Sequence, residues 1–192
     1  STLAIKLKDH AKKSAQSAYR TKILFDTNQL LQRADSENDI IAIAAHQLMK
    51  LLKRDIIIYP VVNNNIGEAN IFLSDGDEDE IKDIIIDEKD VARWVLENNH
   101  QAGATTEIFS QAKFLYYAIR INENIYGIIG IHINDNSLDS FESSILLSIL
   151  GECAISLENK KISREKEETE LLAKNEKMRA NLLRAISHDL RT

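Results

Sequence analysis

Apolar residues follow a helical period at both ends of this chain and form shorter, denser runs in its middle. Residues 1–34 contain neither Gly nor Pro, and their later apolar positions recur near helical spacing, which predicts one long helix with weak packing at its beginning. Residues 35–39 offer N-cap chemistry, and an amphipathic helix is predicted over 40–52. From about residue 138 to residue 192 the pattern again predicts helix.

The middle of the chain predicts strands joined by turns. Residues 56–62 form a β-branched run, in which Pro60 indicates a strand end or a sheet edge. A second strand is expected near 69–73, after an Asn-rich turn. Residues 114–121 and 125–133 predict a hairpin, because two β-branched and aromatic runs are separated by a short polar turn.

Four segments lie between the second strand and the hairpin. Residues 75–80 indicate an acidic loop, 81–86 a short helix or strand that periodicity does not settle, 87–99 a helix, and 101–112 a polar loop. The order of elements predicts an α+β fold, in which an antiparallel sheet lies between flanking helices packed mainly on one face. This layout resembles the GAF domain, a sensory fold that the chain enters and leaves through helices.

Composition narrows the class of protein. With 44% apolar residues among 192, the chain is expected to bury a real core. Its single cysteine, Cys153, excludes an internal disulfide framework and a Cys-based zinc site, and it fits a reducing, cytoplasmic setting. The sequence contains no run of about 18 apolar residues and does not open like a signal peptide, so we expect no membrane span within it.

Charge divides the chain into three parts. Residues 1–34, predicted to be a signalling helix, carry a net charge of +5, residues 35–155, predicted to be the sensory domain, carry −13, and residues 156–192, predicted to be the output helix, carry +2. An acidic central domain repels phosphates, so we expect no nucleic-acid partner for it.

A heptad-like seam and a histidine mark the C-terminal helix. Residues 163–170 are too polar for a core and predict a solvated linker. At about 100° per residue His188 lies about 200° from Ile186 and Leu190, so it is predicted to face water. On spacing alone it is either a surface histidine or a nucleophile. Beyond the linker, steps of four and three residues with one polar layer predict a paired helix, through Leu171, Asn175, Met178, Leu182 and Ala185.

The sequence Ser187-His188-Asp189-Leu190-Arg191-Thr192 resembles the H-box of sensor histidine kinases. The resemblance implies that His188 is the phosphoacceptor, which takes a phosphoryl group from ATP and passes it to an aspartate of a response regulator. It also implies that Asp189 is the acidic partner of the autokinase step and that Thr192 places water for dephosphorylation of the regulator. The ATP-binding boxes do not occur in these 192 residues. ATP and magnesium are therefore expected for the parent protein, whereas no cofactor, no metal and no kinase activity are expected for this segment alone.

Further segments resemble sensor kinases of the KdpD type: residues 92–106, 126–131, 24–34 and 182–192. One departure is Gln101, which stands where that family commonly has a proline. The resemblance implies a multi-pass membrane protein with these residues on the cytoplasmic side, acting as a homodimer, and a KdpE-like response regulator that controls potassium-uptake genes. It places the basic start just inside the membrane, at Lys6, Lys8, Lys12, Lys13 and Arg20.

The remaining candidates have simpler explanations. Asp75, Asp77 and Asp79 alternate as in a calcium loop, but the following residues lack the glycine and glutamate of that motif. His132 is expected to be an outward-facing residue on its strand rather than a metal ligand. Cys153 is expected to be an inert core thiol. The other histidines, His10, His46 and His100, lack ligand spacing, and most aromatic residues are expected in the core.

The sequence leaves two functions open, and they belong to different classes of protein. The first is a signal-transmitting segment of a KdpD-type kinase. The alternative is a GAF domain of another histidine kinase that binds a small ligand such as a cyclic nucleotide. An enclosed pocket with convergent polar groups would favour the alternative, whereas a filled interior would favour the first. A free-standing enzyme is disfavoured because residues 35–155 contain no phosphate-binding loop and no nucleophile and base pair.

Overall fold

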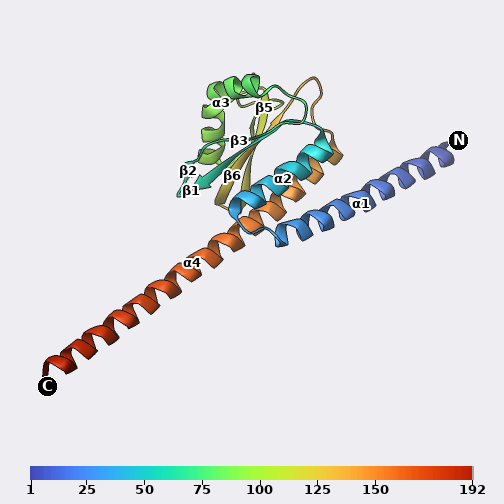
Figure 1. Cartoon of the computed structure of the whole chain (residues 1–192). Coiled ribbons are helices and arrows are strands. Elements are labelled where there is room, and N and C mark those ends of the chain that lie inside the picture. Colours follow the sequence, from blue (N-terminus) through green and yellow to red (C-terminus); the bar gives the residue numbers. More distant parts are fainter. Residues whose placement is uncertain (192) are drawn as a thin grey trace. The chain divides into compact units, whose positions relative to one another are not determined.

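The computed structural model describes residues 1–191, and four helices form at the positions that their caps and apolar periods specify (Figure 1). Helix α1 spans Thr2–Gln32 and α2 spans Glu37–Leu52, which begins at a capping box of Ser36 and Asp39. Helix α3 spans Glu78–Asn98, and α4 spans Ser140–Arg191. The predicted first, second and last helices are therefore confirmed.

One antiparallel sheet forms the middle of the fold. Strand β1 spans Ile56–Val62, β5 spans Phe114–Ile121 and β6 spans Asn124–His132, and β5 and β6 make the predicted hairpin. The order is β2-β1-β6-β5-β4, and β3 also pairs with β1. The three short strands are β2 at Asn65–Ile66, β3 at Asn70–Phe72 and β4 at Ala102–Gly103.

The acidic segment 75–80 is a loop only at its beginning. Asp77 is the N-cap of α3, and its side chain accepts hydrogen bonds from the amides of Asp79 and Glu80. Glu78, Asp79 and Glu80 occupy the first turn, where carboxylates are favoured by the helix dipole. The undecided segment 81–86 therefore continues one helix, and the expectation of a separate acidic loop over 75–80 was wrong.

Pro60 lies inside the sheet rather than at its end or edge. It is opposite Gly127 of β6 on one side of β1, and its carbonyl accepts a hydrogen bond from Gly67 on the other. The amide position of a strand residue points to the same side as its carbonyl, so the missing N–H faces the break between β2 and β3. The edge prediction was wrong because the interruption is local to these two short strands.

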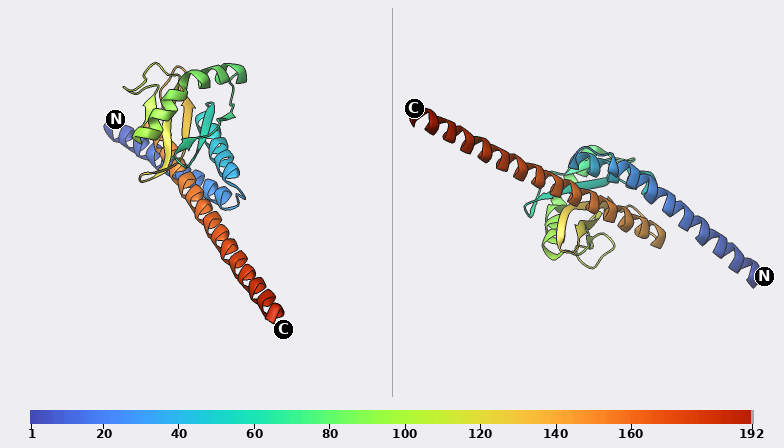
Figure 2. Two further views of the ribbon diagram at one scale, coloured as in Figure 1. Left: turned by 90° about the vertical axis from the view of Figure 1, so that its left-hand side faces the viewer. Right: turned by 90° about the horizontal axis from the view of Figure 1, so that it is seen from below.

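Two hydrophobic clusters cover opposite faces of the sheet, because successive residues of β1 alternate between them. Ile56 and Ile58 pack with α2, the second half of α1 and the first part of α4. Ile57 and Tyr59 pack with α3, the helix drawn in green on the other side of the sheet (Figures 1 and 2). The α+β prediction is confirmed, with the addition that α3 encloses the second face.

Part of α4 is apolar enough, by length and composition alone, to cross a membrane, although the sequence analysis expected no such stretch. The buried apolar residues of this helix, between Ile145 and Leu157, form part of the hydrophobic core against the sheet. Core helices pass the same test of composition. Packing within the domain therefore accounts for part of the stretch, since 39% of it is buried.

The described chain divides into two compact units, residues 1–157 and the residues from Glu158 onward. The first unit contains the sheet and its covering helices. The second is a single helical segment, in which each residue from Lys161 to Arg191 is exposed. The second unit therefore has no core of its own.

Candidate functional site

His188 lies in the exposed part of α4, next to an acidic residue. Its side chain is 81% exposed, and its Nδ1 lies 3.7 Å from Oδ1 of Asp189, which is 87% exposed. A pair with this exposure contributes little to stability, so it does not fix the orientation of the ring. The carboxylate is nevertheless close enough to interact with the ring. Thr192, the third predicted site residue, lies outside the described residues.

The apolar residues around His188 are also exposed. Leu182, Ile186 and Leu190 present large side chains to solvent, as do Leu171 and Met178 of the predicted seam. Such a row of exposed apolar side chains at heptad spacing is typical of a helix that pairs with another. The exposure of His188 agrees with the prediction, but it does not by itself distinguish the histidine from its neighbours.

The first unit contains a buried carboxylate that the sequence analysis did not single out. Glu88 of α3 is 7% exposed. It accepts hydrogen bonds from the Lys113 amide at 2.5 Å, the Phe114 amide at 3.2 Å and the Tyr116 hydroxyl at 2.9 Å. One signal was available, because position 88 falls in the helical apolar stripe of α3, which comprises Ile81, Ile84, Val91 and Val95.

Two buried tyrosines lie near this carboxylate. Burial raises the pKa of Tyr116, and the negative charge of Glu88 raises it further. Burial also raises the pKa of Tyr59 to about 12, with smaller contributions from Glu88 and Glu68. The Tyr59 hydroxyl has no hydrogen-bond partner within residues 1–191. Both phenols are neutral at physiological pH, and they fill the space between the sheet and α3.

These shifts predict that the first unit loses stability in alkaline solution. Burial raises the pKa of Tyr59 from 10.0 to about 12 and that of Cys153 from 9.0 to about 12. A raised folded-state pKa gives a contribution that is fully present below the unfolded value and is lost as the pH rises through the folded value. We expect the free energy of unfolding to fall between about pH 9 and pH 12.

Urea unfolding at pH 8 and pH 11 measures this loss. Tyr59→Phe removes one of the titrating groups, so the variant should lose less stability between the two pH values than the wild type. An equal loss in the two proteins would contradict the role of Tyr59. Cys153 is buried, which agrees with its predicted place in the core.

A groove of about 680 Å³ opens between α3 and the segment 107–113. Its walls include apolar side chains such as Ile84, Val91 and Phe109. Of the described lining residues, Lys113 is the one basic residue, and its ammonium lies 3.9 Å from Glu80. The acidic lining residues are Glu80, Asp83, Asp87, Glu88 and Glu107. This charge makes the groove unsuited to phosphate-bearing ligands.

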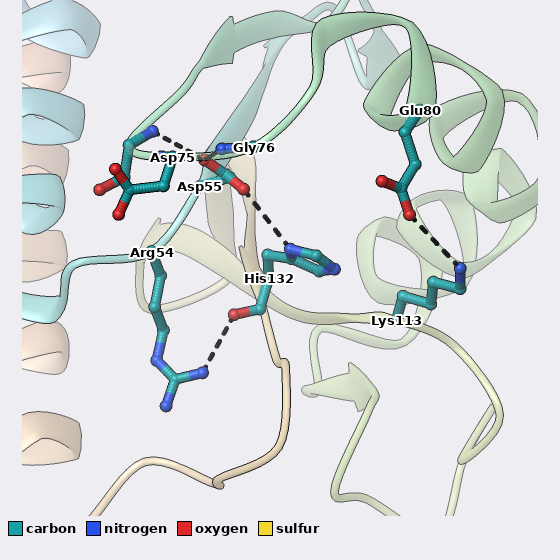
Figure 3. Close-up of polar contacts among 8 residues, drawn as sticks. Arg54, Asp55, Asp75, Gly76, Glu80, Lys113 and His132 are labelled. Atoms are coloured by element: carbon teal, nitrogen blue, oxygen red, sulfur yellow. Dashed lines mark hydrogen bonds and ion pairs between the residues drawn. The ribbon is translucent and has the colours of Figure 1, made fainter.

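The start of β1 carries a second buried carboxylate, which is shown in Figure 3. Oδ1 of Asp55 accepts hydrogen bonds from the amides of Ser74, Asp75 and Gly76 at 2.7, 3.3 and 3.2 Å. Its Oδ2 lies 3.5 Å from Nδ1 of His132. The loop predicted to be merely acidic therefore holds a carboxylate with its backbone amides, as three converging N–H groups can.

His132 was expected to face outward, but its side chain is largely covered. Its side chain is 18% exposed and its ring stacks on Phe114, with 4.9 Å between the ring centroids. The expectation of an outward-facing side chain was wrong because both faces of β6 are covered. His132 is therefore a structural partner of Asp55.

The remaining predicted candidates are dispersed. Asp77 caps α3, and no group of three or more His, Cys, Asp or Glu residues suited to a metal ion occurs within residues 1–191. His10, His46 and His100 are exposed. Trp94 makes an edge contact with Phe109 beside the groove, with 6.4 Å between ring centroids. The first unit therefore contains two separate buried carboxylates, Asp55 and Glu88, each with its own hydrogen-bond donors. The predicted site residues His188 and Asp189 lie outside this unit.

Comparison with known proteins shows which sequences and folds resemble this chain. No family model matches the chain. The sensor protein KdpD of Clostridium acetobutylicum is 28% identical over all 192 residues, and the chain spans about a fifth of that protein's length (21%). The crystal structure of the GAF domain of the potassium sensor histidine kinase KdpD from Escherichia coli superposes with a TM-score of 0.59 at 16% identity, over 76% of this chain and 98% of that one.

A GAF domain from an Acinetobacter phosphoenolpyruvate-protein phosphotransferase is also similar, with a TM-score of 0.54 at 12% identity, over 75% of this chain and 95% of that domain. These structural similarities define the fold of the chain as that of a GAF domain. The chain thus has a GAF-domain fold, and along all 192 residues its sequence is similar to a segment of a KdpD sensor protein.

Proposed function

We propose that this chain is the signal-transmitting segment of a membrane-bound sensor histidine kinase, in which the GAF domain controls phosphorylation of His188. The observation that carries the proposal is the H-box-like sequence 187–192, whose described residues 187–191 lie on an exposed helix with Nδ1 of His188 3.7 Å from a carboxylate oxygen of Asp189. The whole-length similarity to a KdpD sensor protein supports it, because the matched residues include this sequence.

The chemistry requires a nucleophilic nitrogen that a nucleotide can reach. In the proposed step, Nε2 of neutral His188 attacks the γ-phosphorus of ATP, a P–N bond forms, and the P–O bond to ADP breaks. The ring then carries a positive charge until a proton leaves, and Asp189, which lies on the Nδ1 side, stabilises that charge or accepts the proton. ATP and magnesium would be bound by a domain of the parent kinase outside these residues.

The seam on α4 supplies the means of control. Its exposed apolar residues suit a parallel partner helix from a second copy of the chain, and Asn175 would add a polar layer within that pair. A polar layer lowers the stability of such a pair, and we propose that this moderately held seam accommodates two registers. In this proposal the GAF domain shifts the balance between them, and Thr192 serves the dephosphorylation of the response regulator.

The wider role follows from the relatives and is part of the same proposal. The parent kinase would be anchored through transmembrane helices, with the basic residues of α1 near the cytoplasmic surface of the membrane. It would signal to a KdpE-like response regulator that controls potassium uptake. The name of the similar Escherichia coli protein, a potassium sensor histidine kinase, motivates the choice of stimulus.

Mapping the modified residue in the full-length kinase tests the proposal. The kinase is incubated with ATP and magnesium, digested at neutral to alkaline pH, at which phosphohistidine survives, and analysed by mass spectrometry. A phosphoryl group on His188 is the expected result. Modification of a different residue within 1–192, with none at His188, would overturn the proposal.

The alternative function is binding of a small ligand such as a cyclic nucleotide, and for a cyclic nucleotide it is disfavoured by the α3 side of the domain. Tyr59, Phe114 and Tyr116 fill the space between the sheet and α3, and the open groove beside it is lined by carboxylates. We expect calorimetric titration of the chain with cyclic AMP or cyclic GMP to give only heats of dilution. A saturable heat at micromolar ligand would restore the alternative.

A further inference from the structure

Asp55 lies where three connections of the domain meet. It follows the C-cap residue of α2 by two positions and precedes β1. Its side chain holds the loop 74–76, which leads through the cap residue Asp77 into α3. Its backbone carbonyl accepts a hydrogen bond from the His132 amide at 3.0 Å, at the end of β6. One residue thus contacts segments that lead to both faces of the sheet.

The end of β6 is in turn tied to the connection that begins α4. Arg54, the neighbour of Asp55, donates to the His132 carbonyl at 3.2 Å and to the Asn136 carbonyl at 2.7 Å. Asn136 belongs to the segment 133–139, which ends immediately before Ser140, the first residue of α4. Figure 3 shows both contacts with His132: the Asp55 carboxylate lies beside the His132 ring, and the Arg54 guanidinium donates to the His132 backbone carbonyl.

We propose that Asp55 couples the beginning of α3 to the beginning of α4, so that a displacement of the loop 74–76 alters the order of residues 132–139. Three amide donors hold the buried Asp55 carboxylate beside the His132 ring, so moving the carboxylate leaves these donors unsatisfied and changes its contact with His132. The coupling is a property of residues 1–157 and holds whether or not His188 accepts a phosphoryl group.

The sequence itself offers a probe that pushes the carboxylate from the α3 side. A Cβ atom at Gly76 would be 2.2 Å from Oδ2 of Asp55 and 2.8 Å from its Cγ, so Gly76→Ala must displace this side chain relative to the loop 74–76. Asp75→Ala is the matched control, because it changes an exposed side chain of the same loop and leaves all three backbone donors in place.

Hydrogen exchange of the 192-residue chain, read by mass spectrometry, tests the coupling. Gly76→Ala is expected to accelerate exchange about tenfold in residues 132–139, relative to peptides from the centre of β5, whereas Asp75→Ala changes it less than about twofold. Asp55→Ala alone should already accelerate exchange in residues 132–139, and in that background Gly76→Ala should add less than about twofold. Equal acceleration by Gly76→Ala in both backgrounds would overturn the proposal.

A second background keeps the test decisive where Asp55→Ala prevents folding. His132→Phe removes the contact with Asp55 and keeps an aromatic ring to stack on Phe114. The effect of Gly76→Ala on residues 132–139 should then shrink about threefold. An undiminished effect in this background would show that the loop acts on α4 without the Asp55 and His132 pair.

Discussion

Replacing His188 with glutamine in the full-length kinase is expected to reduce phosphorylation from γ-labelled ATP to background, a loss of more than about 100-fold. Glutamine has good helix propensity, so α4 should persist, but its amide nitrogen is not a nucleophile. The measurement is label retained on the protein after electrophoresis at alkaline pH, because a P–N bond is hydrolysed in acid. Circular dichroism checks that helix content is unchanged.

Two further variants separate the nucleophile from its surroundings. His100→Gln changes another exposed histidine, which lies in the GAF domain, and should leave labelling at the wild-type level. Asp189→Asn keeps the size of the side chain beside His188 and removes its charge, so labelling should slow by about 100-fold without disappearing. Label retained by the His188→Gln protein would show that the phosphoacceptor is elsewhere.

Much of the fold could be predicted from the sequence because local signals and burial agree there. Residues 40–52 have both a cap and an apolar stripe, and the hairpin of β5 and β6 has two apolar runs around a short turn. The segment 75–80 was misjudged because a cluster of acids was taken to indicate a solvated loop. In the structure the same charges stabilise the first turn of α3.

The missed features are those that depend on contacts distant in sequence. Pro60 is tolerated inside the sheet because two short strands leave a gap beside it, and this gap is invisible in the local pattern. His132 is covered because α3 closes the second face of the sheet. For His188 the limit is different, because spacing predicts only its exposure, whereas the functional assignment rests on the resemblance of residues 187–192 to a known motif.

Replacement of Glu88 should strongly destabilise the GAF domain. Its carboxylate satisfies two backbone amides and the Tyr116 hydroxyl inside the cluster between the sheet and α3. Leaving a buried donor without a partner costs about 1–3 kcal/mol, and Glu88→Ala leaves two such donors, the Phe114 amide and the Tyr116 hydroxyl, together with the part-buried Lys113 amide. Allowing for some entry of water, we expect the free energy of unfolding to fall by about 4 kcal/mol.

Urea unfolding followed by the fluorescence of Trp94, the chain's one tryptophan, measures this loss, since Trp94 lies on α3 itself. Glu97→Ala is the matched control, because it makes the same change at an exposed position of the same helix and should cost less than about 0.5 kcal/mol. In a Tyr116→Phe background one of the three donors is already absent. There the cost of Glu88→Ala should shrink by about 1 kcal/mol. A Glu88→Ala protein as stable as the Glu97→Ala control would show that these three hydrogen bonds do not hold α3 to the sheet.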